Sequence, residues 1–534
     1  MYTPENEYGN IEYKLKLLNT SDSRLQSLTS QLMFRLNEGN GECIYVLGVT
    51  DKGVNVGLTD IEFKESFHNL SMIVKEHNLG MSILSEKKID TKKIYELLIR
   101  QHNNKYIDIK VTVAGAVDAG KSSLLGVLVS GKQDDGRGLA RLSIFNFKHE
   151  IQSGRTSSIA HHIIGFDING DCVNKEDVYK KGWTEIIQKS VKIISLFDLC
   201  GHERYLKTTI FGLTSTIPDV CLILIGSNMG ITRITQEHIF LCNTLNIPFV
   251  IIITKIDICD NRQNVLMDTI NSINKLLKMP GLRKIPYKIS NQDDVILCSK
   301  NIYSDSIVPI FHVSSVTGIG IHYLKMFFNL IKSNKQSVEN KNSEYYIDTP
   351  FTVNGVGTVV GGHLIIGKVA VNDKLFLGPL YNGEYVETQV KSIHCKQTPV
   401  LSISNGEYVC FALKKINKSL IRRGMVLVSS KEQCNSIYEF DANITVLKSY
   451  TTTIKPGYQT IVHVGNVRQA IKLISISHSS TNNLELLKTG DSATVKFSFM
   501  FRPEFIKINS IILMAEGKVK LIGTIITIYP MTIV

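Results

Sequence analysis

Cysteine pairs and long apolar runs are both missing from this sequence. It has ten cysteines in 534 residues, and they stand singly, with no CxxC pair. Single cysteines argue against a disulfide framework or structural zinc and favour a reducing cytosol. The longest apolar runs, residues 220–226 and 248–254, are shorter than a membrane span and have the length of buried strands. Residues 1–7 are polar and acidic, unlike a signal peptide, so we expect a cytoplasmic protein without membrane contact.

The positive charge of the chain is unevenly distributed. The net charge is +12, and residues 345–534 contribute +8 of it, with 20 basic and 12 acidic side chains. Such a basic region fits a polyanionic partner such as RNA, although a generally lysine-rich composition would give the same count. The basic residues gather most closely in one segment, which we predict to contact RNA and whose alternative role is a solvated loop: Lys414, Lys415, Lys418, Arg422 and Arg423.

The pattern of apolar residues divides the chain into four domains. Residues 1–105 predict an α+β domain, with helices over 25–36 and 61–78 and strands over 42–49, 54–58, 81–84 and 93–100. Residues 106–333 alternate between strand and helix patterns, which predicts a parallel sheet, and residues 333–345 form a polar linker. Short β-branched runs between glycines then predict two β-barrels, over residues 346–432 and 437–534. The expected fold is therefore multidomain, α/β plus β.

A phosphate-binding loop is the most specific motif. Residues 115–122 fit GxxxxGK[ST], between an apolar strand and the start of a helix. Backbone N–H groups and the positive helix end would surround the phosphates of a nucleoside triphosphate. Lys121 would reach the β- and γ-phosphates, and the Ser122 hydroxyl would hold Mg²⁺. The predicted phosphate-binding residues are Gly115, Val117, Asp118, Ala119, Gly120, Lys121, Ser122 and Ser123.

Two later segments predict that the base is guanine. Residues 254–257, Thr-Lys-Ile-Asp, follow an apolar strand and resemble the [NT]KxD element of GTPases. The Asp257 carboxylate would accept from the N1 and N2 hydrogens of guanine, a donor pair that adenine lacks. Lys255 would lie along the base, and Thr254 stands where asparagine is more common. A weaker signal at Ser314, Ser315 and Val316 resembles the last GTPase element, where a backbone N–H meets the guanine carbonyl.

The hydrolytic element lies between these motifs. Asp198 ends an apolar strand and opens DxxGH, in which it would bind Mg²⁺ through water, with Gly201 sensing the γ-phosphate. His202 stands where other GTPases use glutamine, and we predict that it orients the attacking water. A solvated histidine on a mobile loop is the alternative. DxxGH and the Val-Asp-Ala-Gly-Lys form of the phosphate loop are typical of translation-factor GTPases.

The first switch is expected between residues 132 and 190, a stretch too long for an ordinary connection. Residues 150–159 resemble the Arg-Gly-Ile-Thr segment of elongation factors. Matched on Arg155, Ser158 takes the place of the threonine that holds Mg²⁺, and Thr156 is the competing candidate. Ser157 falls where the family has an apolar gate residue, of which Val117 would supply the other half. A flexible polar loop is the alternative.

The whole chain resembles translational GTPases of the elongation factor Tu and elongation factor one alpha class. Residues 10–17, 117–128, 148–158, 202–209 and 411–416 carry a closer resemblance to the GTP-binding protein 1 and 2 family. The resemblance implies a GTP-binding core with GTP or GDP and Mg²⁺, two barrels and a cytoplasmic setting. It also implies contact with the ribosome, tRNA or mRNA, or with mRNA-decay proteins, and we expect a monomer.

Three functions share this expected pocket. The leading hypothesis is a GTP-hydrolysing switch that binds tRNA or ribosome-associated RNA. The second is a GTP-dependent adaptor that recruits protein partners, such as mRNA-decay machinery, with little turnover. The third, a sulfate-activating GTPase, is disfavoured because the chain has no motif for an adenylyltransferase partner. The sequence leaves open which RNA is bound and what residues 1–105 do.

Overall fold

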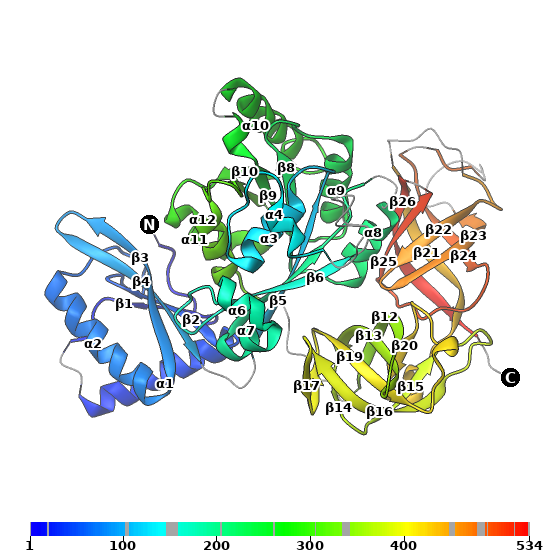
Figure 1. The fold of residues 1–534 in the computed structure, drawn as a ribbon, viewed down its shortest axis with the longest axis horizontal. Helices are drawn as coiled ribbons and strands as arrows, with labels where there is room; N and C mark the ends of the chain where they lie inside the picture. Colours follow the sequence, from blue (N-terminus) through cyan, green and yellow to red (C-terminus); the bar gives the residue numbers. More distant parts are fainter. Residues whose placement is uncertain are drawn as a thin grey trace.

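A computed structural model shows an N-terminal domain, a central domain and two barrels, with the N-terminal domain and the barrels on either side of the central domain (Figure 1). The residues that it describes are 2–18, 21–101, 106–145, 159–202, 206–259, 262–304, 306–333, 342–447, 454–477, 486–488, 490–516 and 518–531. No helix among these residues is long and apolar enough to cross a membrane.

The N-terminal domain is a four-stranded sheet with the order β1-β2-β4-β3, covered by two helices. Its elements are β1 (Ile11–Lys14), α1 (Asp22–Glu38), β2 (Glu42–Leu47), α2 (Asp60–Glu76), β3 (Leu79–Ile89) and β4 (Lys92–Gln101). A capping box fixes the start of α2, because the Thr59 hydroxyl accepts from the Glu62 N–H while the Glu62 carboxylate accepts from the Thr59 N–H. The predicted α+β domain is confirmed.

The strand predicted over residues 54–58 is wrong. Only isolated bridges occur there, between Val49 and Asn55 and between Leu58 and Lys93. Gly53 and Gly57 both have left-handed φ angles, of 80° and 75°, which bend the chain away from a ladder. The carbonyl of Gly48 accepts from two successive N–H groups, those of Val56 and Gly57, instead of from one cross-strand partner.

The central domain contains a seven-stranded sheet with the order β10-β11-β9-β8-β5-β7-β6. All pairs are parallel except β6 with β7, so the predicted parallel sheet has one antiparallel edge. Its strands are β5 (Ile107–Gly115), β6 (Ala160–Phe166), β7 (Lys192–Asp198), β8 (Val220–Gly226), β9 (Phe249–Thr254), β10 (Ile285–Lys288) and β11 (Ile307–His312). Its helices are α3 (Lys121–Ser130), α4 (Leu139–Leu142), α6 (Glu176–Lys181), α7 (Trp183–Lys189), α8 (Leu206–Ser215), α9 (Arg233–Thr244), α10 (Gln263–Leu277), α11 (Gln292–Asn301) and α12 (Ile321–Leu330), with short 3₁₀ turns η2 (Ile256–Cys259) and η3 (Ile302–Ser304).

Helices cover both faces of this sheet. Alternate residues of β8 face opposite cores, with Leu222 packed in the core that includes α3, α11 and α12, and Ile223 in the core that includes α8, α9 and α10. The helix α11 begins with a capping box of Asn291 and Asp294. Two buried faces explain why β8 and β9 are continuously apolar.

The C-terminal region forms two closed barrels, as predicted. Six strands close barrel 1 through the pairing of β15 with β16, and a separate six-stranded ring forms barrel 2. Barrel 1 and its short appended elements comprise β12 (Glu344–Val353), β13 (Gly357–Ile366), β14 (Lys368–Ala370), β15 (Lys374–Gly378), β16 (Val386–Cys395), β17 (Thr398–Val400), β18 (Ser402–Ser404), β19 (Glu407–Lys414), η4 (Lys418–Leu420), β20 (Val426–Val428) and η5 (Lys431–Gln433). Barrel 2 comprises β21 (Ile437–Val446), β22 (Gln459–Val464), β23 (Val467–Ser477), β24 (Ser492–Phe499), β25 (Ile511–Glu516) and β26 (Lys518–Pro530). Because β12 starts at Glu344, the predicted linker ends before it.

A buried ion cluster joins the N-terminal domain to the central domain. The Glu42 carboxylate of β2 lies 2.7 Å from Arg100 Nε of β4 and 2.9 Å from Lys192 Nζ of β7. Lys192 also donates to the carbonyls of Asn329 and Ile331 at the end of α12. Burial raises the pKa of Glu42, but the two cations outweigh it, so the pKa lies below its ordinary value. Separating the two domains would leave these buried charges without their partners, which is costly. The cluster therefore fixes the orientation of the N-terminal domain.

Candidate nucleotide-binding site

The predicted motifs meet at one edge of the central sheet. Asp198 is the last residue of β7, Thr254 is the last residue of β9, and Ser314 follows β11. β5 lies between β7 and β8 in the middle of the sheet, and the phosphate loop leaves its carboxyl end. The carboxyl ends of parallel strands share an edge, so residues far apart in sequence surround one position above β5.

The phosphate loop has backbone angles that its glycines permit. Gly120 has a left-handed φ of 79° and caps α3, and Asp118 shares this region with a φ of 60°. Gly115 has a φ of 145°, and a Cβ there would lie 2.5 Å from the Leu224 carbonyl oxygen. Ala119 is buried, Val117 is half-buried and Asp118 is exposed. Lys121, Ser122 and Ser123 begin α3, and the positive end of a helix dipole at its first turn favours an anion.

Lys121 lies beneath the loop and against the DxxG element. Its Nζ donates to the carbonyls of Gly115 at 3.1 Å and Ala116 at 2.7 Å. A Cβ on Gly201 would meet this ammonium and would lie within 2.7 Å and 2.9 Å of the same two carbonyl oxygens. Only glycine therefore allows the Asp198–Gly201 loop to approach the phosphate loop so closely. Burial lowers the pKa of Lys121, which a nearby anion such as Asp198 opposes.

Two of the three predicted Mg²⁺ residues are adjacent. The Ser122 hydroxyl donates to Asp198 Oδ2 at 3.2 Å, which brings together two oxygen donors from α3 and β7. Hard oxygen ligands suit Mg²⁺, which in nucleotide sites takes few protein ligands and completes its shell with phosphates and water. Within the described part of the chain, no group of three or more His, Cys, Asp or Glu could hold a metal by itself. The residues present thus fit Mg²⁺ bound together with a nucleotide.

The guanine element is tied to the phosphate loop. Thr254 Oγ1 donates to the Ala119 carbonyl at 2.8 Å, so threonine makes a direct link between the two loops. Lys255 has a left-handed φ of 59°, and its Cε would lie 3.8 Å from a Cβ on Gly120. Asp257 is half-buried in η2. Sequence analysis missed Ser227, whose hydroxyl donates to the Lys255 carbonyl at 2.7 Å and supports the loop from below.

Replacing Thr254 with valine is expected to weaken GTP and GDP binding. Valine has the shape of threonine but would leave the buried Ala119 carbonyl without its 2.8 Å hydrogen bond. An unsatisfied buried acceptor costs about 1–3 kcal/mol, or about 5- to 150-fold in affinity. Titration calorimetry with GDP measures the change. Thr112→Val is the matched control, because the buried Thr112 hydroxyl has no hydrogen-bond partner among the described residues. Equal losses in both variants would contradict the link.

The last predicted guanine contact lies in a turn after β11. Ser314 is fully buried, and its hydroxyl accepts from the N–H groups of Val316 at 3.2 Å and Thr317 at 3.1 Å. The Ser315 carbonyl accepts from the Asp134 N–H at 2.9 Å, and Val316 is exposed. Ser314 thus shapes the turn through its side chain, while Ser315 and Val316 form its outer part.

The switch residues are only partly described. His202 is half-buried directly after Gly201, and the Thr209 hydroxyl of α8 donates to the Cys200 carbonyl at 2.8 Å, which anchors this loop to the helix. Arg155, Thr156, Ser157 and Ser158 lie outside the described residues, so the Mg²⁺ ligand of the first switch stays a prediction.

The predicted basic RNA surface is wrong for one of its five residues, Arg422. Arg422 Nη1 lies 2.7 Å from Glu504 of barrel 2, and the side chain is 12% exposed. Arg423 is exposed, although its Nε donates to the Asp348 carbonyl at 2.8 Å and its guanidinium carbon lies 4.4 Å from the centroid of the Phe211 ring in α8. These arginines join domains, since their partners lie far away in sequence. Lys415 and Lys418 are exposed, as the prediction required.

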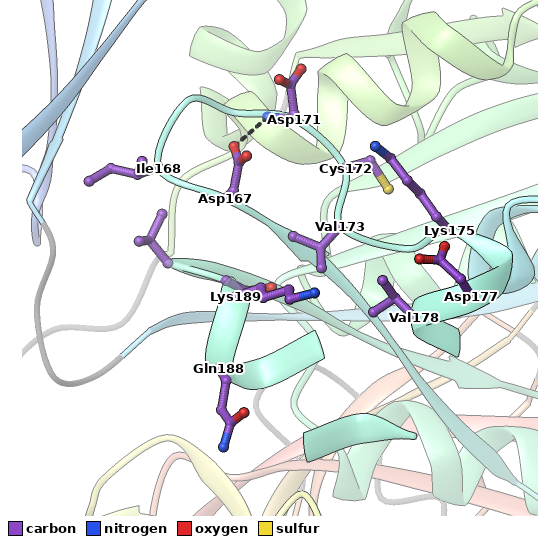
Figure 2. Close-up of a pocket in the computed structure, with 12 residues that line it drawn as sticks. Asp167, Ile168, Asp171, Cys172, Val173, Lys175, Asp177, Val178, Gln188 and Lys189 are labelled. Carbon is purple, nitrogen blue, oxygen red and sulfur yellow. Dashed lines mark hydrogen bonds between the residues drawn. The ribbon is translucent and has the colours of Figure 1, made fainter. Parts of the chain in front are cut away.

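A separate pocket of about 530 Å³ lies beyond β6, at the opposite edge of the sheet (Figure 2). Asp167 follows β6, and Val191 precedes β7. The pocket therefore lies at the end of the antiparallel β6–β7 pair that is farther from the phosphate loop. The Asp167 carboxylate accepts from the Asp171 N–H at 2.9 Å and closes the turn. The Asp167 carboxylate therefore shapes a turn of this pocket, far from the nucleotide-binding edge.

Comparison with known proteins assigns this architecture to one class. The family model of the elongation factor Tu GTP-binding domain matches residues 108–339. Two solved structures share the fold. Translation elongation factor SelB from Methanococcus maripaludis, in complex with the GTP analogue GppNHp, has a TM-score of 0.56 and 19% identity over 80% of this chain and 81% of that chain. The GTP-bound Ski7 GTPase-like domain from S. cerevisiae has a TM-score of 0.58 and 14% identity over 79% of this chain and 97% of that chain.

Two relatives match almost the full length of this chain. GTP-binding protein 1 of Xenopus laevis is 42% identical, over 96% of this chain and 78% of that protein. GTP-binding protein 2 of Homo sapiens is 39% identical, over 99% of this chain and 88% of that protein. The chain belongs to this family of GTP-binding proteins within the elongation factor Tu class. The family and the site together indicate a GTPase that binds GTP and GDP, as predicted.

Proposed function

We propose that this protein is a cytoplasmic, Mg²⁺-dependent GTPase whose nucleotide state controls binding of tRNA or ribosome-associated RNA, and that it acts as a monomer. The proposal is supported most by α8, the helix that follows the DxxGH loop. Barrel 1 contacts α8 through Arg423 on Phe211, and barrel 2 contacts it through β22, while Leu513 and Ala515 of β25 belong to the same apolar core as Ile210 of α8. One helix after the DxxGH loop therefore contacts both barrels, and Figure 1 shows it beside β25 and β26 of barrel 2.

The residues divide the chemistry among themselves. The N–H groups of the phosphate loop and Lys121 would bind the phosphates, and Asp257 would select guanine. Ser122 and Asp198 would hold Mg²⁺, which supplies positive charge against the β- and γ-phosphates when bound. His202 would orient the attacking water. Loss of the γ-phosphate would release Gly201 and its loop, and α8 would carry the change to both barrels.

The test is the affinity for tRNA at fixed salt, with a non-hydrolysable GTP analogue and with GDP. We expect the two affinities to differ by about 5- to 150-fold, the usual range of coupling between two sites. Arg423→Ala should reduce this ratio, because it removes the contact between barrel 1 and Phe211. Lys368→Ala is the control, since Lys368 is exposed on β14 of barrel 1, outside the predicted RNA-contacting segment, and its loss should leave the ratio unchanged.

Equal affinities in both nucleotide states would remove the switch from the proposal. A GTP-dependent adaptor for protein partners would then be preferred, and absence of ribosome-stimulated hydrolysis would support it. The salt dependence of RNA affinity separates the RNA-binding switch from the protein adaptor further. For a protein that binds RNA, each phosphate contact steepens the fall of log affinity with log salt concentration by about 0.7–0.9.

A further inference from the structure

Two aromatic side chains are exposed on neighbouring loops of the two barrels. Tyr381, in the turn after β15 of barrel 1, is 69% exposed. Phe501, which follows β24 of barrel 2, is 66% exposed. Scattered exposed apolar residues are ordinary on protein surfaces, so exposure alone indicates nothing. The significance lies in how firmly both loops are held.

A buried glutamine fixes the loop that displays Phe501. Gln469 of β23 is 4% exposed, and its Oε1 accepts from the N–H groups of Phe501 at 2.9 Å and Arg502 at 3.0 Å. Its Nε2 donates to the Arg502 carbonyl at 3.1 Å and to Glu504 Oε1 at 2.8 Å. Every polar group of this amide is used, so the loop is held in one conformation.

Arg422 then joins this loop to the Tyr381 loop. Its Nη2 donates to the carbonyls of Pro379 at 3.2 Å and Pro503 at 3.1 Å, two residues from Tyr381 and Phe501 respectively. The Arg502 guanidinium carbon lies 5.7 Å from the centroid of the Tyr381 ring. Tyr381, Phe501 and Arg502 thus form one rigid surface across the seam between the barrels, which we call the seam platform.

The chemistry of the seam platform fits single-stranded RNA better than a protein. Isolated rings held rigidly can stack on bases of any sequence, and a neighbouring guanidinium can contact a phosphate. A protein partner would need a continuous apolar area, but here Arg502 follows the exposed apolar pair of Met500 and Phe501, and the exposed polar residues Asn382 and Glu384 follow Tyr381. The two barrels that carry the platform, residues 345–534, have a net charge of +8, which attracts a polyanion.

We propose that the seam platform binds single-stranded RNA, with bases stacked on Tyr381 and Phe501 and a phosphate contacted by Arg502. This inference rests on the proposed RNA-binding function and adds a second RNA surface to it. Among the described residues, the hydrogen bonds and the ring contact that hold the platform run between the two barrels and not to α8 or the phosphate loop. The affinity of the platform for single-stranded RNA should therefore be the same with GTP analogue and with GDP.

The test is fluorescence anisotropy of the full-length protein with a labelled, unstructured oligoribonucleotide. Tyr381→Ala and Phe501→Ala should each lower the affinity by about 5- to 150-fold, the range for loss of one stacked base. Tyr381→Phe keeps the ring and should bind like wild type. Leu401→Ala is the matched control, since Leu401 is 84% exposed in barrel 1 but lies outside the platform. GTP affinity should be unchanged in all four variants.

Three outcomes would overturn the inference. Wild-type oligonucleotide affinity in the Tyr381→Ala, Phe501→Ala double variant would remove the seam platform and leave the proposed tRNA switch intact. A wild-type protein that binds neither tRNA nor the oligonucleotide would overturn both proposals. Self-association that the double variant abolishes, with RNA affinity unchanged, would assign the platform to a second copy of the chain.

Discussion

Asp257→Asn is expected to reduce GTP affinity roughly 100-fold or more and to shift preference toward xanthine nucleotides. A carboxylate accepts from two donors of guanine, and charge-assisted hydrogen bonds contribute about 1.5–3 kcal/mol each. Asparagine offers one acceptor and one donor, which suits the additional carbonyl of xanthine. Ser227 and Thr254 hold the Asp257 loop independently of the substituted side chain, so its position should persist.

Competition binding with GTP, XTP and ATP measures this change in selectivity. The wild type should prefer GTP over ATP strongly, because adenine would leave the carboxylate unpaired. Asp268→Asn provides the control, since Asp268 lies exposed on α10 and the same chemical change there should alter no affinity. Equal wild-type affinities for ATP and GTP, or no gain for XTP in Asp257→Asn, would contradict the guanine assignment.

The sequence could predict the arrangement of the nucleotide-binding edge because its determinants are local. Gly115 and Gly120 occupy backbone angles that favour glycine, and each motif follows an apolar strand. The spacing of strands and helices then brings the strand ends together without further information. Local geometry explains why a motif needs glycine at a given position. At Gly201, for example, an added Cβ would collide with the phosphate loop.

The roles of Arg422 and Arg423 could not be predicted from the same reasoning. A cluster of basic residues has the same appearance in sequence whether it faces solvent or another domain. Their partners are Glu504, in the second barrel, and Phe211, in α8. Only the packing of three domains brings these residues together, and no local pattern encodes that packing. The seam platform has no local sequence pattern for the same reason, since Gln469 and Phe501 are 32 residues apart.

The docking of the N-terminal domain also depends on distant pairs. Glu42, Arg100 and Lys192 are each ordinary charged residues in the sequence, yet all three are nearly inaccessible to solvent. Their strands were predicted, but a buried charge on a strand has no signature in composition. The resulting cluster makes the N-terminal domain a fixed part of the central domain, attached at the end of α12.

His202→Ala is expected to leave GTP affinity nearly unchanged while abolishing most stimulated hydrolysis. His202 directly follows Gly201, which lies against Lys121 and the phosphate loop, so we predict that its side chain reaches a water near the γ-phosphate. An interaction made only in the transition state affects turnover and not ground-state binding. Intrinsic turnover should be slow, because the sequence offers Arg155 as its single weak candidate for an arginine finger in cis.

External activation in this chemistry contributes about 10³–10⁵-fold, and we expect the ribosome to supply it by positioning His202. Single-turnover hydrolysis with and without ribosomes measures both rates for wild type and His202→Ala. His322→Ala is the control, because His322 is exposed on α12 and lies away from the DxxGH loop in sequence. Stimulated turnover in His202→Ala equal to that of wild type would mean that another residue orients the water, because activation would then proceed without the imidazole.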